Sequence, residues 1–303
     1  MARVLEDGVA IQYRTEKVGH EYDLSIVIPA YNEINAIEGG IKELQNMIAE
    51  HKLDAEIVVV DDGSTDGTYE AALKTGVRVI RVDQNMGYGH SLKTGIRQSN
   101  SKFVAITDAD GTYPADRIPE MLDLCRDGDM IVGDRGAAMR NVPLVRKPAK
   151  WVLNKLANIL AQRKIPDLNS GLRVFRRVSI ERFLSLMPNG FSFSTTSTLC
   201  MICSDLQVTY VPITYGRRIG QSKIRPTDFF RFMLLVVRII VLFHPLRVFL
   251  PVGFVLFLLG FSKAIYDLFL MNLSESAIFA LLAALVIWSL GLIADMISRL
   301  HFR

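Results

Sequence analysis

Short apolar runs alternate with amphipathic segments over residues 24–110, and this alternation constrains the fold more than any other feature of the chain. The runs have the length and composition of buried strands, and they cover residues 24–28, 56–60, 77–82 and 103–107. Between the first two runs, residues 34–51 carry isoleucine and leucine at helical spacing. Strands and helices that alternate in this way predict an α/β fold with a mostly parallel sheet covered on both faces.

Polar clusters follow three of these strands directly, at residues 29–33, 61–68 and 108–112. In open parallel sheets, ligands bind outside the carboxyl ends of the strands, so we expect the three clusters to share one site. A dinucleotide-binding Rossmann domain is the obvious rival. Because no Gly-x-Gly-x-x-Gly follows the first strand, we reject a dehydrogenase.

Asp108 and Asp110 form an acid pair directly after the 103–107 strand. Side chains at positions i and i+2 of an extended segment point the same way, so both carboxylates can face one point. Two hard oxygen ligands suit a Mg²⁺ or Mn²⁺ ion that keeps open positions for phosphate oxygens. A simple turn is the alternative, because Asp110-Gly111 is a common turn signal.

Composition excludes several classes of function. The formal net charge of +4 comes without any block rich in Lys and Arg, so no nucleic-acid partner is expected. Residues 1–23 are polar and charged, which argues against a signal peptide and for a catalytic part that stays in the cytoplasm. Cys200 and Cys203 have Cys-x-x-Cys spacing but no accompanying second pair or histidine cluster, so we expect buried helix positions rather than a zinc or redox site.

Beyond the acid pair the pattern continues, with strands predicted at residues 129–133 and 209–213 and a helix at 148–162. Residues up to 21 show no clear period and are expected to form an N-terminal arm. Three cations occupy predicted loops, and they are Arg135, Arg217 and Lys223. Such charges are ordinarily solvated, but in a site built around phosphates they become candidate clamps.

The last quarter of the chain is dominated by Leu, Val, Ile and Phe, and it predicts a membrane anchor. Residues 229–243 are interrupted by arginines and indicate an amphipathic helix at the membrane surface. Residues 248–270 and 277–297 are each long enough to cross the hydrocarbon core, with a pair of buried core helices as the alternative. Lys263 and Asp267 lie four residues apart and can either pair or extend toward the outer interface.

The charges that flank the two spans predict their orientation. Arginines precede the first span and follow the second, whereas the connecting loop has no Lys or Arg. By the positive-inside rule, both ends and the catalytic part are cytoplasmic. The predicted division is a catalytic domain over residues 1–226, an interfacial helix over 227–245 and a transmembrane hairpin over 246–303.

Three motifs, at residues 28–33, 60–68 and 108–110, resemble in their order the inverting family 2 glycosyltransferases. Residues 167–173 and 217–223 are similar to segments of dolichyl-phosphate mannose synthase and the polyprenyl-phosphate glucosyltransferases. The resemblance covers about residues 24–225, and the two-span tail is similar to that of the bacterial polyprenyl-phosphate enzymes. It implies a GT-A fold, which is a Rossmann-like nucleotide-binding α/β domain, and a metal-dependent hexosyltransferase of the EC 2.4 class.

The resemblance also implies roles for single residues. The positions implied to hold the nucleoside of a sugar donor are Pro29, Tyr31, Glu33, Val60 and Asp62. Those implied to line its diphosphate are Asp108, Ala109 and Asp110, with Asp110 as the direct metal ligand. Thr112 stands where many relatives carry a glutamine that helps to hold the metal, so its place among the ligands of Mg²⁺ or Mn²⁺ is left open.

Phosphate binding and proton removal are implied for the later motifs. Arg135, Arg217 and Lys223 are implied to bind the donor diphosphate or a lipid phosphate. Asp167 occupies the position of a base in this family. Because it could equally orient Arg135 or Arg173 through a charge-assisted bond, or cap a turn, these alternatives remain open.

The expected reaction is attack by a polyprenyl or dolichyl phosphate on a nucleotide sugar of the GDP-mannose or UDP-glucose type, with inversion. The partners are then the donor, the lipid acceptor and a bilayer, in the cell membrane or the endoplasmic reticulum; self-association is left open. One alternative is a family 2 enzyme that acts on a sugar hydroxyl in polysaccharide or glycolipid synthesis, and another is a non-catalytic membrane scaffold.

Overall fold

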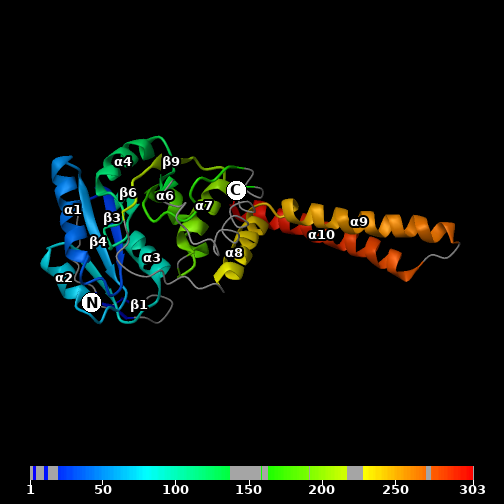
Figure 1. Cartoon of the computed structure of the whole chain (residues 1–303), viewed down its shortest axis with the longest axis horizontal. Helices are drawn as coiled ribbons and strands as arrows, with labels where there is room; N and C mark the ends of the chain where they lie inside the picture. Colours follow the sequence, from blue (N-terminus) through cyan, green and yellow to red (C-terminus); the bar gives the residue numbers. More distant parts are fainter. Residues whose placement is uncertain are drawn as a thin grey trace. The chain divides into compact units, whose positions relative to one another are not determined.

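The protein is described by a computed structural model, which covers residues 3–4, 10–12, 20–136, 158, 163–190, 192–216, 228–270 and 274–302. The chain divides into two compact units (Figure 1). The first unit comprises residues 1–154 and 164–226, and the second comprises residues 155–163 and 227–303.

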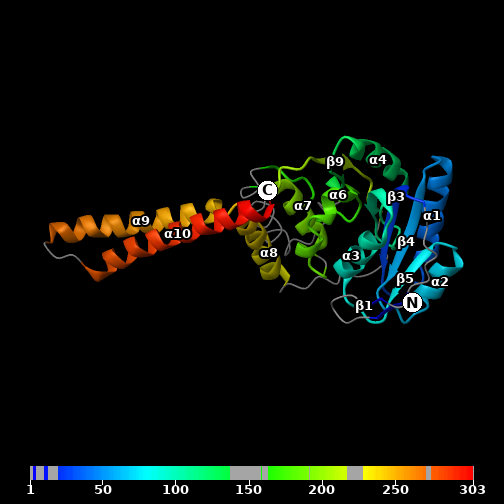
Figure 2. The same ribbon diagram turned by 180° about the vertical axis from the view of Figure 1, so that it is seen from behind.

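A nine-stranded sheet forms the centre of the first unit, within the described residues. Its strands are β1 (Arg3–Val4), β2 (Ala10–Gln12), β3 (Tyr22–Ala30), β4 (Ala55–Asp61), β5 (Arg78–Val82), β6 (Ser101–Ile106), β7 (Met130–Asp134), β8 (Arg173–Arg176) and β9 (Val208–Pro212). Their spatial order is β1-β2-β5-β4-β3-β6-β8-β7-β9. Figure 2 shows β5 and β4 from behind, next to helix α2.

Most strands of this sheet point the same way, as predicted. The central strands β5, β4, β3 and β6 pair in parallel, and β7 pairs in parallel with β9. Among the described strands, only β2 and β8 run in the opposite direction to the others, so each is antiparallel to both of its neighbours. The predicted N-terminal arm contains β1 and β2, which extend the sheet beyond β5, and residues 173–176 form a strand that the apolar pattern did not indicate.

Helices cover both faces of the sheet (Figure 1). They are α1 (Ile37–Glu50), α2 (Thr68–Lys74), α3 (Tyr88–Gln98), α4 (Ile118–Arg126), α6 (Arg177–Glu181) and α7 (Phe193–Cys203), with short 3₁₀ turns η1 (Ala115–Arg117) and η4 (Leu184–Leu186). Alternate residues of β3 pack with α1, α2 and α4 in one apolar core. On the opposite face, Gly95 of α3 lies so close that an added Cβ would be 2.3 Å from a methyl group of Val27.

The three cysteines are free and buried, as expected for Cys200 and Cys203. Cys125 lies on α4, and Cys200 and Cys203 lie on α7, all of whose residues are buried. The prediction of buried helix positions is therefore confirmed.

The second unit contains α8 (Asp228–Phe243), α9 (Leu246–Phe269) and α10 (Glu275–Phe302). Two of its helices, over residues 246–269 and 275–300, are long and apolar enough to cross a membrane. Only 11% and 17% of their most apolar windows are buried in the described structure, which disfavours the alternative of two core helices. Helices α9 and α10 contain most of the two predicted spans, residues 248–270 and 277–297.

Glycines bring α9 and α10 together as a hairpin. A Cβ added at Gly253 would lie 2.4 Å from Nε1 of Trp288, and one added at Gly260 would lie 2.9 Å from Cβ of Ala280. Small residues at such positions let two helices approach closely in a membrane. At the hairpin turn, Lys263 pairs with Asp267 at 2.5 Å, so the first of the two alternatives for this pair is observed.

Candidate active site

The loops after β3 and β4 are locked together by hydrogen bonds. The backbone N–H of Asn32 donates to Oγ of Ser64 at 2.9 Å, and the N–H of Thr65 donates back to Oδ1 of Asn32 at 3.0 Å. Asn32 has φ +55°, a left-handed conformation that asparagine tolerates better than most residues. The first two predicted polar clusters therefore form one continuous surface at the carboxyl edge of the sheet.

Asp62, directly after β4, is buried and binds the segment that leads into α3. Its Oδ1 accepts the backbone N–H of Met86 at 3.0 Å, and its Oδ2 accepts that of Gly87 at 2.8 Å. The first turn of α3 is also pressed against the backbone of residues 188–190. An added Cβ at Gly87 or Gly89 would lie 2.6 or 2.1 Å from a carbonyl oxygen of that segment, so glycine is required at both positions.

The acid pair lies in the loop directly after β6, and each carboxylate accepts a bond from a neighbouring hydroxyl. Tyr88 donates to Oδ1 of Asp108 at 2.9 Å. Thr112 donates to Oδ1 of Asp110 twice, from its backbone N–H at 3.1 Å and from its hydroxyl at 2.6 Å. Asp110 thus forms a local turn, as the alternative interpretation proposed, and the turn holds the carboxylate in place.

Tyr113 lies between the acid pair and a buried ion pair. Its hydroxyl accepts the backbone N–H of Gly171 at 2.7 Å, and its ring meets that of Tyr215 edge-on at 5.0 Å. The guanidinium of Arg135 lies 5.4 Å from the Tyr215 ring centre. Burial, and the nearby Asp108 carboxylate after it, raise the pKa of both Tyr88 and Tyr113, so both hydroxyls stay protonated at neutral pH.

Arg135 and Asp167 form the buried ion pair. Nε and Nη2 of Arg135 donate to the two oxygens of Asp167 at 2.8 and 2.9 Å, a bidentate geometry. The backbone N–H of Asn169 adds a third bond at 3.1 Å. Burial alone would raise the pKa of Asp167, but the bonds and charge of Arg135 hold it below its ordinary value. Of the two arginines considered for Asp167, the structure brings Arg135 to it.

Arg173 is fully buried and ties the loop after Asp167 to α7. It donates to the carbonyl oxygens of Ser170 at 2.8 Å and Leu168 at 3.1 Å, and to the hydroxyl of Thr198 at 2.6 Å. Desolvation lowers its pKa from the ordinary value. This role was not predicted, because the sequence offered Arg173 only as a partner for an acid.

The remaining residues implied for the donor lie at the same edge. Pro29 and Val60 are buried in β3 and β4, Ala109 is buried beside α1, and Tyr31 and Glu33 are half-buried. Arg217, Lys223 and nearly all of the predicted 148–162 helix lie outside the described residues. The described chain before Arg217 stops at Gly216, whose N–H donates to the carbonyl oxygen of Thr112 at 2.9 Å.

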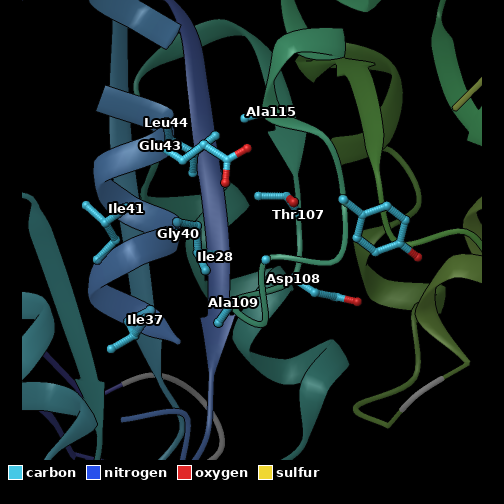
Figure 3. A pocket seen from close by; sticks show the side chains of 12 residues that line it. Ile28, Ile37, Gly40, Ile41, Glu43, Leu44, Thr107, Asp108, Ala109 and Ala115 are labelled. Atoms are coloured by element: carbon cyan, nitrogen blue, oxygen red, sulfur yellow. The ribbon is translucent and has the colours of Figure 1, made fainter. Parts of the chain in front are cut away.

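A small pocket adjoins Asp108 of the acid pair (Figure 3). Ile37 and Ile41 of α1 line one side of it, and Thr107 and Asp108 line the other. Asp110, Arg135 and Asp167 are not among its lining residues. The pocket is therefore next to the candidate site and does not contain all of it.

The acid pair offers a donor set that fits a shared divalent cation. No group of three or more His, Cys, Asp or Glu side chains gathers at one point in the part of the chain that the structure describes. Mg²⁺ usually takes one or two carboxylates and fills its other positions with water and phosphate oxygens. Asp108 and Asp110 fit that pattern, and both are already oriented by other side chains.

Sheet order and apolar hairpin together define an α/β protein with a Rossmann-like, mostly parallel sheet and two candidate membrane spans. The sequence matches the family described as glycosyl transferase family 2 over residues 25–184, and the GtrB C-terminal hairpin over residues 244–300. The first match covers more than half of the 303 residues, and the chain belongs to glycosyl transferase family 2.

Two relatives match different lengths of the chain. A dolichyl-phosphate hexose transferase of Haloferax volcanii is 31% identical over 206 residues, which are 67% of this chain and 87% of the relative. An undecaprenyl-phosphate 4-deoxy-4-formamido-L-arabinose transferase of Photorhabdus laumondii is 25% identical over 298 residues, 92% of this chain and 89% of the relative. The second alignment is long enough to include the hairpin.

A solved structure confirms the predicted fold. Glucosyl-3-phosphoglycerate synthase of Mycobacterium tuberculosis, crystallised with Mn²⁺, UDP and glucosyl-3-phosphoglycerate, aligns with a TM-score of 0.55 and 21% identity. The alignment covers 73% of this chain and 79% of that one. At this identity the likeness shows the GT-A fold alone.

Proposed function

We propose that this protein transfers a hexose from a nucleotide sugar to a polyprenyl or dolichyl phosphate, with inversion at the anomeric carbon. The observation that carries the proposal is the Asp108–Asp110 pair together with the Arg135–Asp167 ion pair, since Asp108 and Arg135 both act on the charge state of Tyr113. One acid centre and one fixed cation suit a reaction between two phosphate-bearing substrates. The hairpin and the relatives' lipid acceptors support a lipid phosphate as one of them.

The donor's nucleoside and diphosphate would occupy the edge formed by β3, β4 and β6. Tyr31, Glu33 and Asp62 would contact the nucleoside, and the buried Pro29 and Val60 would shape its place through the backbone. Asp108 and Asp110 would hold Mg²⁺ or Mn²⁺ against the diphosphate. When bound, the cation would neutralise the charge that develops on the leaving group.

Thr112 and Ala109 have supporting roles in this proposal. The hydroxyl of Thr112 donates to Asp110, so it would orient that ligand whether or not it also touches the cation. Ala109 is buried next to α1, and its small side chain lets the 108–112 loop lie close to the helix.

Arg135 would position the acceptor. A phosphate monoester has a second pKa of about 6, so at neutral pH the nucleophilic oxygen is already largely ionised and needs little help from a base. Holding it in line with the anomeric carbon is then the main task. Burial opposes the charge on Arg135, but its bonds to Asp167 raise its pKa above the ordinary value, so the guanidinium stays charged.

Asp167 would serve as the holder of Arg135. Both of its oxygens accept bonds from that arginine, and its pKa is lowered, which makes it a weak base. These contacts favour the orienting role over proton abstraction. Arg217 and Lys223, which follow Gly216 in the sequence, would complete the phosphate contacts.

The C-terminal helices would bring the catalytic part to the lipid. In this proposal residues 1–226 form the cytoplasmic catalytic domain, residues 227–245 lie at the membrane surface, and residues 246–303 span the bilayer twice. An isoprenoid chain stays in the bilayer, so an anchored domain meets its phosphate at the surface.

The test is an assay of the purified full chain in detergent with Mg²⁺ or Mn²⁺, short polyprenyl phosphates and labelled nucleotide sugars, GDP-mannose and UDP-glucose first. We expect a labelled lipid-linked sugar with at least one donor, and its loss in chelator. A labelled free glycan with no labelled lipid under any donor would overturn the proposal in favour of a hydroxyl acceptor. No transfer with any donor or acceptor would favour a scaffold.

A further inference from the structure

We propose that Tyr88 is a positioning residue for Asp108, and that Asp62 holds Tyr88 in place through the first turn of α3. This inference rests on the proposed function in one respect, that Asp108 holds a divalent cation. It gives a role to the Gly87-Tyr88-Gly89 segment, which the catalytic proposal does not use.

The hydrogen bond between Tyr88 and Asp108 fixes how that carboxylate is turned. The phenol donates to Oδ1 at 2.9 Å, and Oδ2 lies on the side of Gly171, 3.0 Å from where a Cβ of that residue would stand. A hydrogen bond to an ionised acceptor is stronger than one between neutral groups. Tyr88 on one side and the Gly171 backbone on the other therefore limit the carboxylate to one orientation.

The backbone of Tyr88 is fixed by the two glycines around it. Gly87 has φ +104°, which L side chains rarely adopt, and both glycines face carbonyl oxygens of residues 188–190 at distances no Cβ would tolerate. The N–H of His90 donates to the carbonyl oxygen of Asn189 at 3.0 Å, and Lys93 donates to the Asn189 side chain at 2.5 Å. The start of α3 is thus anchored on a second segment, and Tyr88 cannot shift along the sheet.

Asp62 connects this anchor to the edge where the nucleoside would bind. Its carboxylate accepts the N–H groups of the two residues immediately before Tyr88. A continuous path of bonds therefore leads from Asp62 through Gly87 and Tyr88 to Asp108. In metal sites, partners that orient a ligand typically contribute 10- to 100-fold to metal affinity.

The experiment measures Mn²⁺ binding directly, by the electron paramagnetic resonance signal of free Mn²⁺, in the full chain in detergent with UDP or GDP present. We expect Tyr88→Phe to raise the Kd for Mn²⁺ about tenfold or more, because only the orienting hydroxyl is lost. The matched control is Tyr69→Phe on α2, whose ring faces Arg81 through its π surface and which should leave the Kd unchanged.

A double-mutant cycle separates positioning from a general structural defect. In an Asp108→Ala background, which retains Asp110 and the nucleotide diphosphate for weak Mn²⁺ binding, adding Tyr88→Phe should change the Kd less than twofold. If Tyr88→Phe weakened Mn²⁺ binding equally in both backgrounds, the proposal would be overturned. It would also be overturned if the Kd of the Tyr88→Phe single variant lay within twofold of that of the unchanged protein. Failure of the unchanged protein to bind Mn²⁺ with either nucleotide would overturn the metal proposal as well.

Discussion

At the scale of single residues, the candidate site consists of charged groups that are oriented by neutral ones. Tyr88 and Thr112 each hold one member of the acid pair, and Asn169 adds a backbone bond to Asp167. Preorganised groups of this kind cost no reorganisation when charge develops during a reaction. A conservative substitution that removes one of these orienting contacts should therefore affect either metal and substrate binding or the reaction rate, depending on which charged group loses its contact.

Asp167→Asn distinguishes an orienting acid from a base. Asparagine keeps one oxygen acceptor but loses the charge and the bidentate contact with Arg135, so the guanidinium should shift. We expect the KM for polyprenyl phosphate to rise and kcat/KM to fall about 10- to 100-fold, with a smaller change in kcat. Steady-state kinetics over acceptor concentration measure this split. A collapse of kcat with an unchanged KM would instead assign Asp167 to proton removal.

The same ion pair predicts how stability depends on pH. The pKa of Asp167 is lower in the folded protein than its ordinary value of 3.8, so folding favours its ionised form. The stability that this contributes is present above pH 3.8 and is lost as the pH falls from there through the lowered pKa. Chemical unfolding of the unchanged protein and Asp167→Asn should show a gap in unfolding free energy that narrows on acidification. A gap that widens would contradict the ion-pair assignment.

At the scale of helices and strands, the parts that the sequence predicted are those with a local pattern. β3, β4 and β6 each contain a run of apolar residues, and both ends of each strand were predicted to within two residues. β8 is only four residues long, and both of its ends are arginines, so its strand character comes from pairing with β6 and β7. No periodicity in a segment that short can reveal such a pairing.

Pairing across the sheet also decided which arginine meets Asp167. β7 and β8 run antiparallel with Val132 opposite Arg173, which points the Arg173 side chain toward Thr198 on α7. Arg135 follows the end of β7 and meets Asp167, 32 residues further along the chain. The sequence left both arginines open, and Arg173 is the nearer to Asp167 along the chain. The choice depends on a register that only the folded sheet defines.

The close approach of α3 to the sheet gives a prediction about stability. At Gly95, an added methyl group would lie 2.3 Å from Val27, so Gly95→Ala should destabilise the fold by about 1–3 kcal/mol through overpacking. Gly39 on α1 has nothing within 4 Å of an added Cβ, and Gly39→Ala should stabilise by up to about 1 kcal/mol. Urea unfolding of the two variants measures both signs. Equal effects would show that α3 can move away from β3 at little cost.

At the scale of the whole molecule, the two units carry separate parts of the proposed task. The first contains the acid pair and the Arg135–Asp167 pair, and the second contains the two apolar helices. Composition was enough to predict the second unit, since long uncharged stretches are visible in the sequence itself. It was not enough to place the cations that follow Gly216, which lie outside the described residues.

Membrane orientation can be tested with two single cysteines, because all three natural cysteines are buried and should react slowly. Ser276→Cys lies at the start of α10, next to the loop that joins the two apolar helices, and Val178→Cys lies on α6, where the native side chain is 70% exposed. The arginines that flank the hairpin predict a cytoplasmic catalytic unit. In intact cells, a membrane-impermeant maleimide should therefore label Ser276→Cys and leave Val178→Cys unlabelled until the membrane is opened. Labelling of Val178→Cys in intact cells would place the catalytic unit outside, where no cytoplasmic nucleotide sugar could reach it.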